Sequence, residues 1–242
     1  MLTIEKYFFW LMIYSIIGWF YESFITSVAK RKFVNRGFLN GPYCPIYGWG
    51  SIIVILVLGR IENVFILFFL GAFLTCSLEY VTSFVMEKLF HARWWDYSKR
   101  KFNINGRVCL IGAVVFGAFS VILIKLIHPA VMKYTDLIPI PVFHTACAAL
   151  LILFVADNIV TFGGFSGFNK TLNEISKLFE NAKDKIKEEV NEVVIDGLNR
   201  QQRRMIKAFP NLKSLKYENE LSEIRKNLDK IKELRKNKRN PS

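Results

Sequence analysis

Long apolar stretches separated by short polar loops fill the first two thirds of the chain. An α-helix needs about 20 mostly apolar residues to cross the hydrocarbon core of a membrane. The short second stretch is followed closely by the third, which predicts a tight antiparallel hairpin between them. The pattern predicts a helical membrane domain with about five spans, at Tyr7–Ala29, Tyr43–Gly59, Val64–Met86, Val108–Ile127 and Ile138–Phe162.

The chain changes character after Gly163. Residues 164–242 contain 19 of the 33 Lys and Arg residues and 12 of the 20 Asp and Glu residues. We therefore predict two domains, a transmembrane helical domain at 1–163 and a basic cytoplasmic tail at 164–242, joined at the glycine pair 163–164. Apolar residues at three- and four-residue spacings predict amphipathic helices in the tail, which would form a coiled coil or lie on anionic lipid. The two stripes are Ile175, Leu178, Ala182, Ile186, Val190, Val193 and Leu198, and then Leu221, Ile224, Leu228 and Ile231.

The composition narrows the class of protein further. A mean hydropathy of +0.26 together with a net charge of +13 disfavours a soluble enzyme, a secreted disulfide scaffold and a disordered protein. The four cysteines form no C-x-x-C pair, so we expect no disulfide framework and no zinc ribbon. We expect no metal and no cofactor. Nucleic acid is not an expected partner, because the basic residues of the tail are interleaved with acidic ones.

Lysine and arginine are concentrated in alternate loops of the membrane domain. Ten of the 14 basic residues in 1–163 lie in the loops that follow the first and third spans. Because loops rich in Lys and Arg remain in the cytoplasm, we expect a multi-pass protein of the inner, cytoplasmic membrane. Its N-terminus would lie outside, and the two basic loops and the tail would be cytoplasmic. The ten residues are Lys30, Arg31, Lys32, Arg36, Lys88, Arg93, Lys99, Arg100, Lys101 and Arg107.

The two basic loops share an order of residues that suggests an internal repeat. In each copy a Glu and a Ser near the end of a span precede Lys-Arg-Lys-Phe (30–33 and 99–102) and then Asn-Gly-x-x-Cys (40–44 and 105–109). Both copies run inward and then outward, so they would be parallel repeats related by an axis along the membrane normal. The alternative is a coincidence of basic loops with Asn-Gly helix starts.

If the repeat is real, the second and fourth spans both begin at the cytoplasmic face. Asn40 and Asn105 are then predicted N-caps, and the free amides of a helix N-terminus carry partial positive charge. Arg36 and Arg107 stand beside these ends. Helix N-termini and arginines together would hold an anion such as a phosphate or a carboxylate.

The same loops are dense in amide, guanidinium, phenol, carboxylate and imidazole groups. Ionisable side chains inside membrane spans are costly and default to a functional hypothesis, which here applies to Glu22, Glu79 and Asp157. We expect these acids to pair with Arg36, Arg107 or His91 in one polar cluster. The alternatives are polar pairing between helices for the acids and an aromatic belt for the Trp and Tyr residues. The predicted ligand-binding residues are Glu22, Arg36, Asn40, Tyr43, Glu79, His91, Trp95, Asp96, Tyr97, Asn103, Asn105 and Arg107, of which Glu79, His91 and Asp96 are also candidate catalytic acids or bases.

These loops resemble a known family. The segments 35–48, 79–80, 91–97 and 103–107 are similar to the bacterial family called putative ABC-transporter type IV. The resemblance covers roughly Gly18 to Pro129 and leaves the tail outside. It implies an integral membrane protein of the permease type, and it carries over no substrate.

Three functions remain in consideration. The leading hypothesis is a permease-like membrane protein whose cytoplasmic-side site takes an anionic ligand or a lipid headgroup. The second is a membrane-embedded enzyme that modifies a lipid-linked or amphiphilic substrate, although the balance of the sequence is against an enzyme. The third is a membrane-anchored adaptor. Expected partners are membrane lipids, an anionic small molecule or headgroup, and a helical protein or a second copy bound through the tail.

Overall fold

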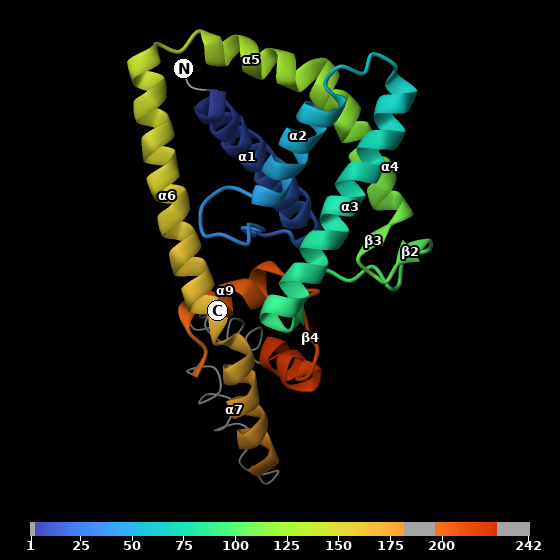
Figure 1. Cartoon of the computed structure of the whole chain (residues 1–242). Helices are drawn as coiled ribbons and strands as arrows, with labels where there is room; N and C mark the ends of the chain where they lie inside the picture. The colour runs from blue at the N-terminus through green and yellow to red at the C-terminus, as the bar shows by residue number, and fades with distance from the viewer. Residues whose placement is uncertain (1–2, 182–196, 227–242) are drawn as a thin grey trace, which may run out of the picture. The chain divides into compact units, whose positions relative to one another are not determined.

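The computed structural model describes residues 3–181 and 197–226, and it describes only the backbone of 178–181. This part of the chain is almost entirely helical (Figure 1). The helices are α1 (Thr3–Lys30), α2 (Pro45–Leu58), α3 (Val64–Phe90), α4 (Leu110–Ile122), the π-helical turn η1 (Leu123–Ile127), α5 (His128–Asp136), α6 (Ile140–Ser166), α7 (Phe168–Asn181) and α9 (Arg200–Ala208). The strands are β1 (Ala92–Arg93), β2 (Asn103–Ile104), β3 (Val108–Cys109) and β4 (Lys213–Ser214).

All five apolar stretches form helices close to the predicted limits. Four helical segments of the described residues are long and apolar enough to cross a membrane, namely Thr3–Lys30, Val64–Phe90, Leu110–Asp136 and Ile140–Lys177. The remaining apolar helix, α2, has 14 residues, fewer than the roughly 20 that a straight span needs. The all-helical membrane fold is therefore confirmed, while the number of spans and the internal repeat stay predictions.

The chain forms two compact units. The first contains residues 1–85 and 96–160, and the second contains residues 86–95 and the chain from 161 onward. Two helices, α3 and α6, contribute to both units. We expected a joint at the glycine pair 163–164, but α6 continues through both glycines to Ser166, because an interior glycine weakens a helix by only about 1 kcal/mol. The predicted domain limits themselves stay predictions.

In the first unit, α2 packs along α1, and two glycines make this close approach possible. A Cβ atom on Gly18 would lie 2.2 Å from Cγ of Tyr47, and one on Gly48 would lie 2.2 Å from Oγ of Ser15. The backbone amide of Cys44 also donates to the carbonyl of Ser15 at 2.8 Å. The sequence predicted a tight hairpin of the second and third apolar stretches. The two helices do meet, because a Cβ atom on Gly50 of α2 would lie 3.5 Å from Cδ2 of Leu78 on α3, but the closest packing of α2 is on α1, where small residues allow it.

Polar side chains also connect α1 to the α5 segment within the first unit. Trp10 Nε1 donates to Thr135 Oγ1 at 3.0 Å. Tyr14 Oη and His128 Nδ1 share a hydrogen bond of 2.7 Å. Buried polar groups need such partners when the surroundings are apolar.

The helix starts differ from the prediction that Asn40 and Asn105 are N-caps. The N-cap residues are Cys44 for α2 and Cys109 for α4, and neither side chain caps its helix. Asn105 and Gly106 have φ angles of 52° and 67° and form the turn of the antiparallel hairpin β2–β3. Because Ile104 pairs with Val108, the loop of this hairpin contains Asn105, Gly106 and Arg107. An Asn-Gly pair favours a hairpin turn because both residues tolerate positive φ.

The second unit joins the end of α3 to the tail. Its β1 pairs with β4, Ala92 opposite Ser214, in an antiparallel ladder. Phe90 and Trp94 pack against Phe165, which stacks on Phe168. The helix α9 begins with a capping box in which Asn199 and Gln202 bond to each other's backbone amides.

The apolar stripes of the tail are only partly within the described residues. Four of their members are buried in the structure: Ile175, Leu198, Leu221 and Ile224. The others, Leu178 (side chain), Ala182, Ile186, Val190, Val193, Leu228 and Ile231, lie outside what the structure describes. The coiled coil therefore stays a prediction.

The α1–α2 contact generates a stability prediction. The change Gly48→Ala places a methyl group against Ser15 and against the Leu11 carbonyl oxygen, 2.5 Å away. We expect it to destabilise the protein by about 1–3 kcal/mol, measured as a lower Tm in detergent. The matched control is Gly50→Ala on the same helix, whose Cβ would meet its nearest atom at 3.5 Å. An equal Tm for both variants would contradict this packing.

Candidate functional site

The first basic loop is fixed to α1 and α2 by Glu22. Tyr47 Oη donates to Glu22 Oε1 at 2.7 Å, and Arg36 Nε lies 3.6 Å from Glu22 Oε2. The backbone amide of Arg36 donates to Ser23 Oγ at 3.2 Å. The sequence predicted that Glu22, Glu79 and Asp157 pair with Arg36, Arg107 or His91. The structure shows this for Glu22 and Arg36, whereas the hydrogen-bond partner of Glu79 is Tyr97 and those of Asp157 include Asn40 and Tyr43.

The far part of the same loop is held by Asp157 of α6, which accepts four hydrogen bonds. Its Oδ1 accepts from the backbone amide of Asn40 at 3.0 Å and from Asn40 Nδ2 at 2.8 Å. Its Oδ2 accepts from the backbone amide of Gly41 and from Tyr43 Oη, both at 2.7 Å. Donors to both oxygens stabilise the charged form of a buried carboxylate. The predicted residues Asn40 and Tyr43 therefore share one partner.

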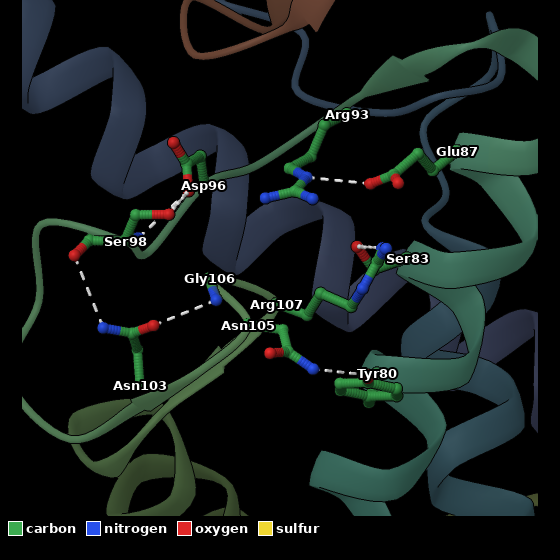
Figure 2. Close-up of polar contacts among 10 residues, drawn as sticks. All are labelled: Tyr80, Ser83, Glu87, Arg93, Asp96, Ser98, Asn103, Asn105, Gly106 and Arg107. Atoms are coloured by element: carbon green, nitrogen blue, oxygen red, sulfur yellow. Dashed lines mark hydrogen bonds and ion pairs between the residues drawn. The ribbon is translucent and has the colours of Figure 1, made fainter. Parts of the chain in front are cut away.

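In the second basic loop, Arg107 lies against α3 (Figure 2). Its Nη1 donates to Ser83 Oγ at 3.2 Å. The guanidinium carbon lies 5.6 Å from the ring centroid of Tyr80 and 5.5 Å from that of Phe84, within cation–π range. Asn105 Nδ2 donates to Tyr80 Oη at 2.9 Å. Arg107 is only 6% exposed, so its charge is held in a largely dry environment.

Two other predicted residues shape this loop. Asn103 Oδ1 accepts from the backbone amide of Gly106 at 2.9 Å, and Asn103 Nδ2 donates to the Arg100 carbonyl at 2.7 Å. Asp96 accepts from the backbone amide of Ser98 at 3.0 Å and from its hydroxyl. Side chains that bond their own turn fix loop conformation. These contacts give Asn103 and Asp96 a structural role in the loop.

Two acidic residues of the first unit, Glu5 and Glu79, have a buried oxygen without a hydrogen-bond partner among the described residues. Oε2 of Glu5 lies 2.7 Å from Nδ1 of His144, so Glu79 on α3 is the one without a nearby basic group at that oxygen. Its Oε1 accepts from Tyr97 Oη at 3.2 Å. Its Oε2 is buried and has no hydrogen-bond partner among the described residues, and the residue is 7% exposed. Burial raises the pKa of the Tyr97 phenol above its ordinary value, and the negative charges of Glu79 and Glu22 raise this pKa further. Tyr97 therefore stays a hydrogen-bond donor to Glu79.

The remaining predicted residues, His91 and Trp95, belong to the second unit. His91 has a left-handed backbone with φ of 51°, is exposed, and accepts from the Leu215 amide through its carbonyl at 3.1 Å. Trp95 is half-buried. In the same unit Arg93 Nε lies 2.8 Å from Glu87 Oε2 (Figure 2), so Arg93 belongs to an ion pair and not only to the charge pattern of the loop.

The structure thus groups the predicted residues of the first unit around shared partners. Glu22 joins Arg36, Asp157 joins Asn40 to Tyr43, and Glu79 joins Tyr97, while Asn105 and Arg107 meet on Tyr80. The sequence missed Tyr47, Tyr80 and Ser83 as partners. Tyr80 and Ser83 lie one and four residues after Glu79 in the sequence. Residues four apart lie on the same face of a helix, so the sequence alone could have placed Ser83 near Glu79. No group of three potential metal ligands occurs among the described residues.

Comparison with known families decides the class of this protein. The family described as putative ABC-transporter type IV matches residues 9–162, which is more than half of the chain. The chain belongs to this family. Comparisons with curated proteins and with solved structures found no match. The match includes both basic loops and every predicted site residue. In this member of the putative ABC-transporter type IV family, the predicted site therefore lies in the part of the chain that the family shares.

The two acids generate opposite stability predictions. Because Oε2 of Glu79 lacks a donor, the neutral variant Glu79→Gln removes a buried charge and should have an equal or higher Tm. The change Glu22→Gln weakens the attraction to Arg36 and should lower the Tm, by about 1 kcal/mol of stability. Thermal unfolding of both variants and the parent in one detergent measures this difference. A Tm loss for Glu79→Gln as large as that for Glu22→Gln would show that Glu79 is a structural partner.

Proposed function

We propose that this chain is a permease-like membrane protein with a site for an anionic ligand or a lipid headgroup at the basic loops. The family and the apolar helices make it a transporter-like membrane protein. The basic loops support an orientation with the N-terminus outside and the tail in the cytoplasm. On this proposal the protein is a multi-pass protein of the bacterial inner membrane, and its tail contacts membrane lipid, a helical partner or a second copy.

The observation that carries the proposal is the unsatisfied oxygen of Glu79. A buried carboxylate oxygen without a donor costs free energy, so such a group calls for an explanation, which can be a functional role or a bound water or ion. Helices that cross a membrane make this cost larger, because lipid offers no donor. We assign Glu79 the role of binding a proton, or of accepting a hydrogen bond from the ligand, with Tyr97 holding its other oxygen.

Arg107 and Arg36 supply the positive charge for the anion. Arg107 is buried against Tyr80 and Phe84, where the low dielectric strengthens its field. Arg36 is more exposed and is balanced by Glu22. The site so proposed contains Glu22, Arg36, Asn40, Tyr43, Glu79, Tyr97, Asn105 and Arg107.

The positions of the candidate acids and bases give less support to the enzyme alternative. Of its three candidate acids and bases, Asp96 bonds to Ser98 within its own turn, and His91 belongs to the second unit. Glu79 is the one buried beside Tyr97 in the first unit. General acid–base catalysis needs a second group positioned on the reacting atoms, so we favour transport.

The experiment compares cells that carry Glu79→Gln, Arg107→Ala or the parent protein by untargeted metabolite and lipid profiling. We expect both variants to change the distribution of one anionic compound or lipid between cells and medium, or between leaflets, with no new covalent product. The control is Lys99→Ala, an exposed residue of the same loop, which should match the parent. A changed covalent product would favour the enzyme. Parent-like profiles of both variants at equal protein levels would overturn the shared site.

A further inference from the structure

A small apolar groove opens beside the β2–β3 hairpin in the first unit. Its volume is about 210 Å³, less than the roughly 300–1,000 Å³ of a site that encloses a whole small molecule. The groove therefore fits part of a ligand. It is lined by Cys76 on α3, Phe102 and Ile104, Val108 and Cys109 on β3, and Ala113 on α4.

The groove and the polar part of the site share one face of α3. Cys76, Tyr80 and Ser83 are spaced by four and three residues, so they lie on the same face of the helix. Cys76 lines the groove, while Tyr80 binds Asn105 and Ser83 binds Arg107. At 1.5 Å per residue, Cys76 and Ser83 are about 10 Å apart along the helix axis. The α3 residue that lines the groove and the α3 residue that binds Arg107 are thus about two helical turns apart on the same face.

The β2–β3 hairpin forms the wall of the groove that faces α3, and like α3 it has an apolar part and a polar part. Ile104 and Val108 are paired across the strands and both line the groove, whereas Asn105 and Arg107 bond to α3. Phe102 and Ile104 are strongly exposed, at 78% and 61%. The hairpin connects two segments that are apolar enough to cross a membrane, so these exposed side chains are placed where acyl chains are available.

We infer that the groove holds an acyl chain of a phospholipid whose anionic headgroup lies at Arg107, Asn105 and Tyr80. The buried charge of Arg107 attracts the phosphate, and the apolar walls take up the chain by removing apolar surface from water. A free anion without an acyl chain would contact only the polar residues and would leave the apolar groove without a ligand. The inference rests on the proposed function, because it assigns the ligand class of the same site.

The test uses the full chain with Cys109 as its one cysteine, obtained by Cys44→Ala, Cys76→Ala and Cys147→Ala. The protein is placed in vesicles of phosphatidylcholine, or of phosphatidylcholine with phosphatidylglycerol. The rate of alkylation of Cys109 by N-ethylmaleimide, a neutral reagent, is measured in both. Cys109 is only 7% exposed, so its alkylation requires a local opening of the groove. An anionic lipid bound in the groove makes this opening rarer, so phosphatidylglycerol should slow alkylation about threefold or more. Equal rates in the two kinds of vesicle would overturn the inference.

Two further variants separate binding from surface potential. Arg107→Gln in the same background should remove the effect of phosphatidylglycerol, whereas an unchanged effect would mean that surface charge alone slows the reaction. Ala113→Phe fills the groove and leaves Arg107 in place, so alkylation should be slow in both kinds of vesicle. Alkylation of this variant as fast as in its parent would overturn the groove whether or not the Arg107 variant folds.

The matched control keeps Cys147 as the one cysteine. Cys147 lies on α6, is buried, and is not among the groove residues, so its rate should not depend on phosphatidylglycerol. The two proposals fail separately. If phosphatidylglycerol does not slow alkylation of Cys109, but the Glu79 and Arg107 variants alter the metabolite and lipid profiles, the lipid proposal is overturned and the transporter site stands. If phosphatidylglycerol slows alkylation of Cys109, but the Glu79 and Arg107 variants have the same profiles as the parent, the transport role is overturned and the lipid site stands.

Discussion

The cost of burying charge among apolar helices determines how this protein is built. In lipid or in a dry protein interior, an ionised side chain is tolerated when hydrogen bonds or an opposite charge replace its lost water. Asp157 meets this demand with Asn40, Gly41 and Tyr43, and Glu22 meets it with Tyr47 and Arg36. The bond between Tyr47 and Glu22 joins α2 to α1, and the others fix a loop to a helix. The basic loops are therefore shaped by the acids of the spans.

The same demand makes Glu79 stand out. It is a carboxylate of the first unit with one satisfied oxygen, bonded to Tyr97, and one buried oxygen without a partner among the described residues. Arg107 is buried too, but its charge is supported by Ser83 and by two aromatic rings. A buried acid that lacks a donor, one helical turn from the Ser83 that binds a buried cation, is a poor structural device. It is a reasonable arrangement for handling a proton and an anion.

Much of this fold follows from local sequence patterns, and the errors have physical reasons. Apolar length and composition predicted the helices, and Glu22 with Arg36 followed from the cost of an acid inside a span. The Asn105-Gly106 pair was assigned to a helix start, although its preference for positive φ favours a hairpin turn. The packing of α2 on α1 and the pairing of β1 with β4 join residues far apart in sequence, which no local pattern specifies. The unsatisfied oxygen of Glu79 likewise depends on three-dimensional surroundings.

The central claim is that Glu79 is a proton-binding or ligand-binding acid, in contrast to the paired Glu22. Dicyclohexylcarbodiimide, which reacts with protonated carboxyl groups in apolar surroundings, tests this claim directly when the protein is kept in membranes at neutral pH and the adducts are mapped by mass spectrometry. The account predicts an adduct on Glu79 and none on Glu22, whose charge is held by Arg36 and Tyr47. An adduct on Glu22 with Glu79 unmodified would contradict it.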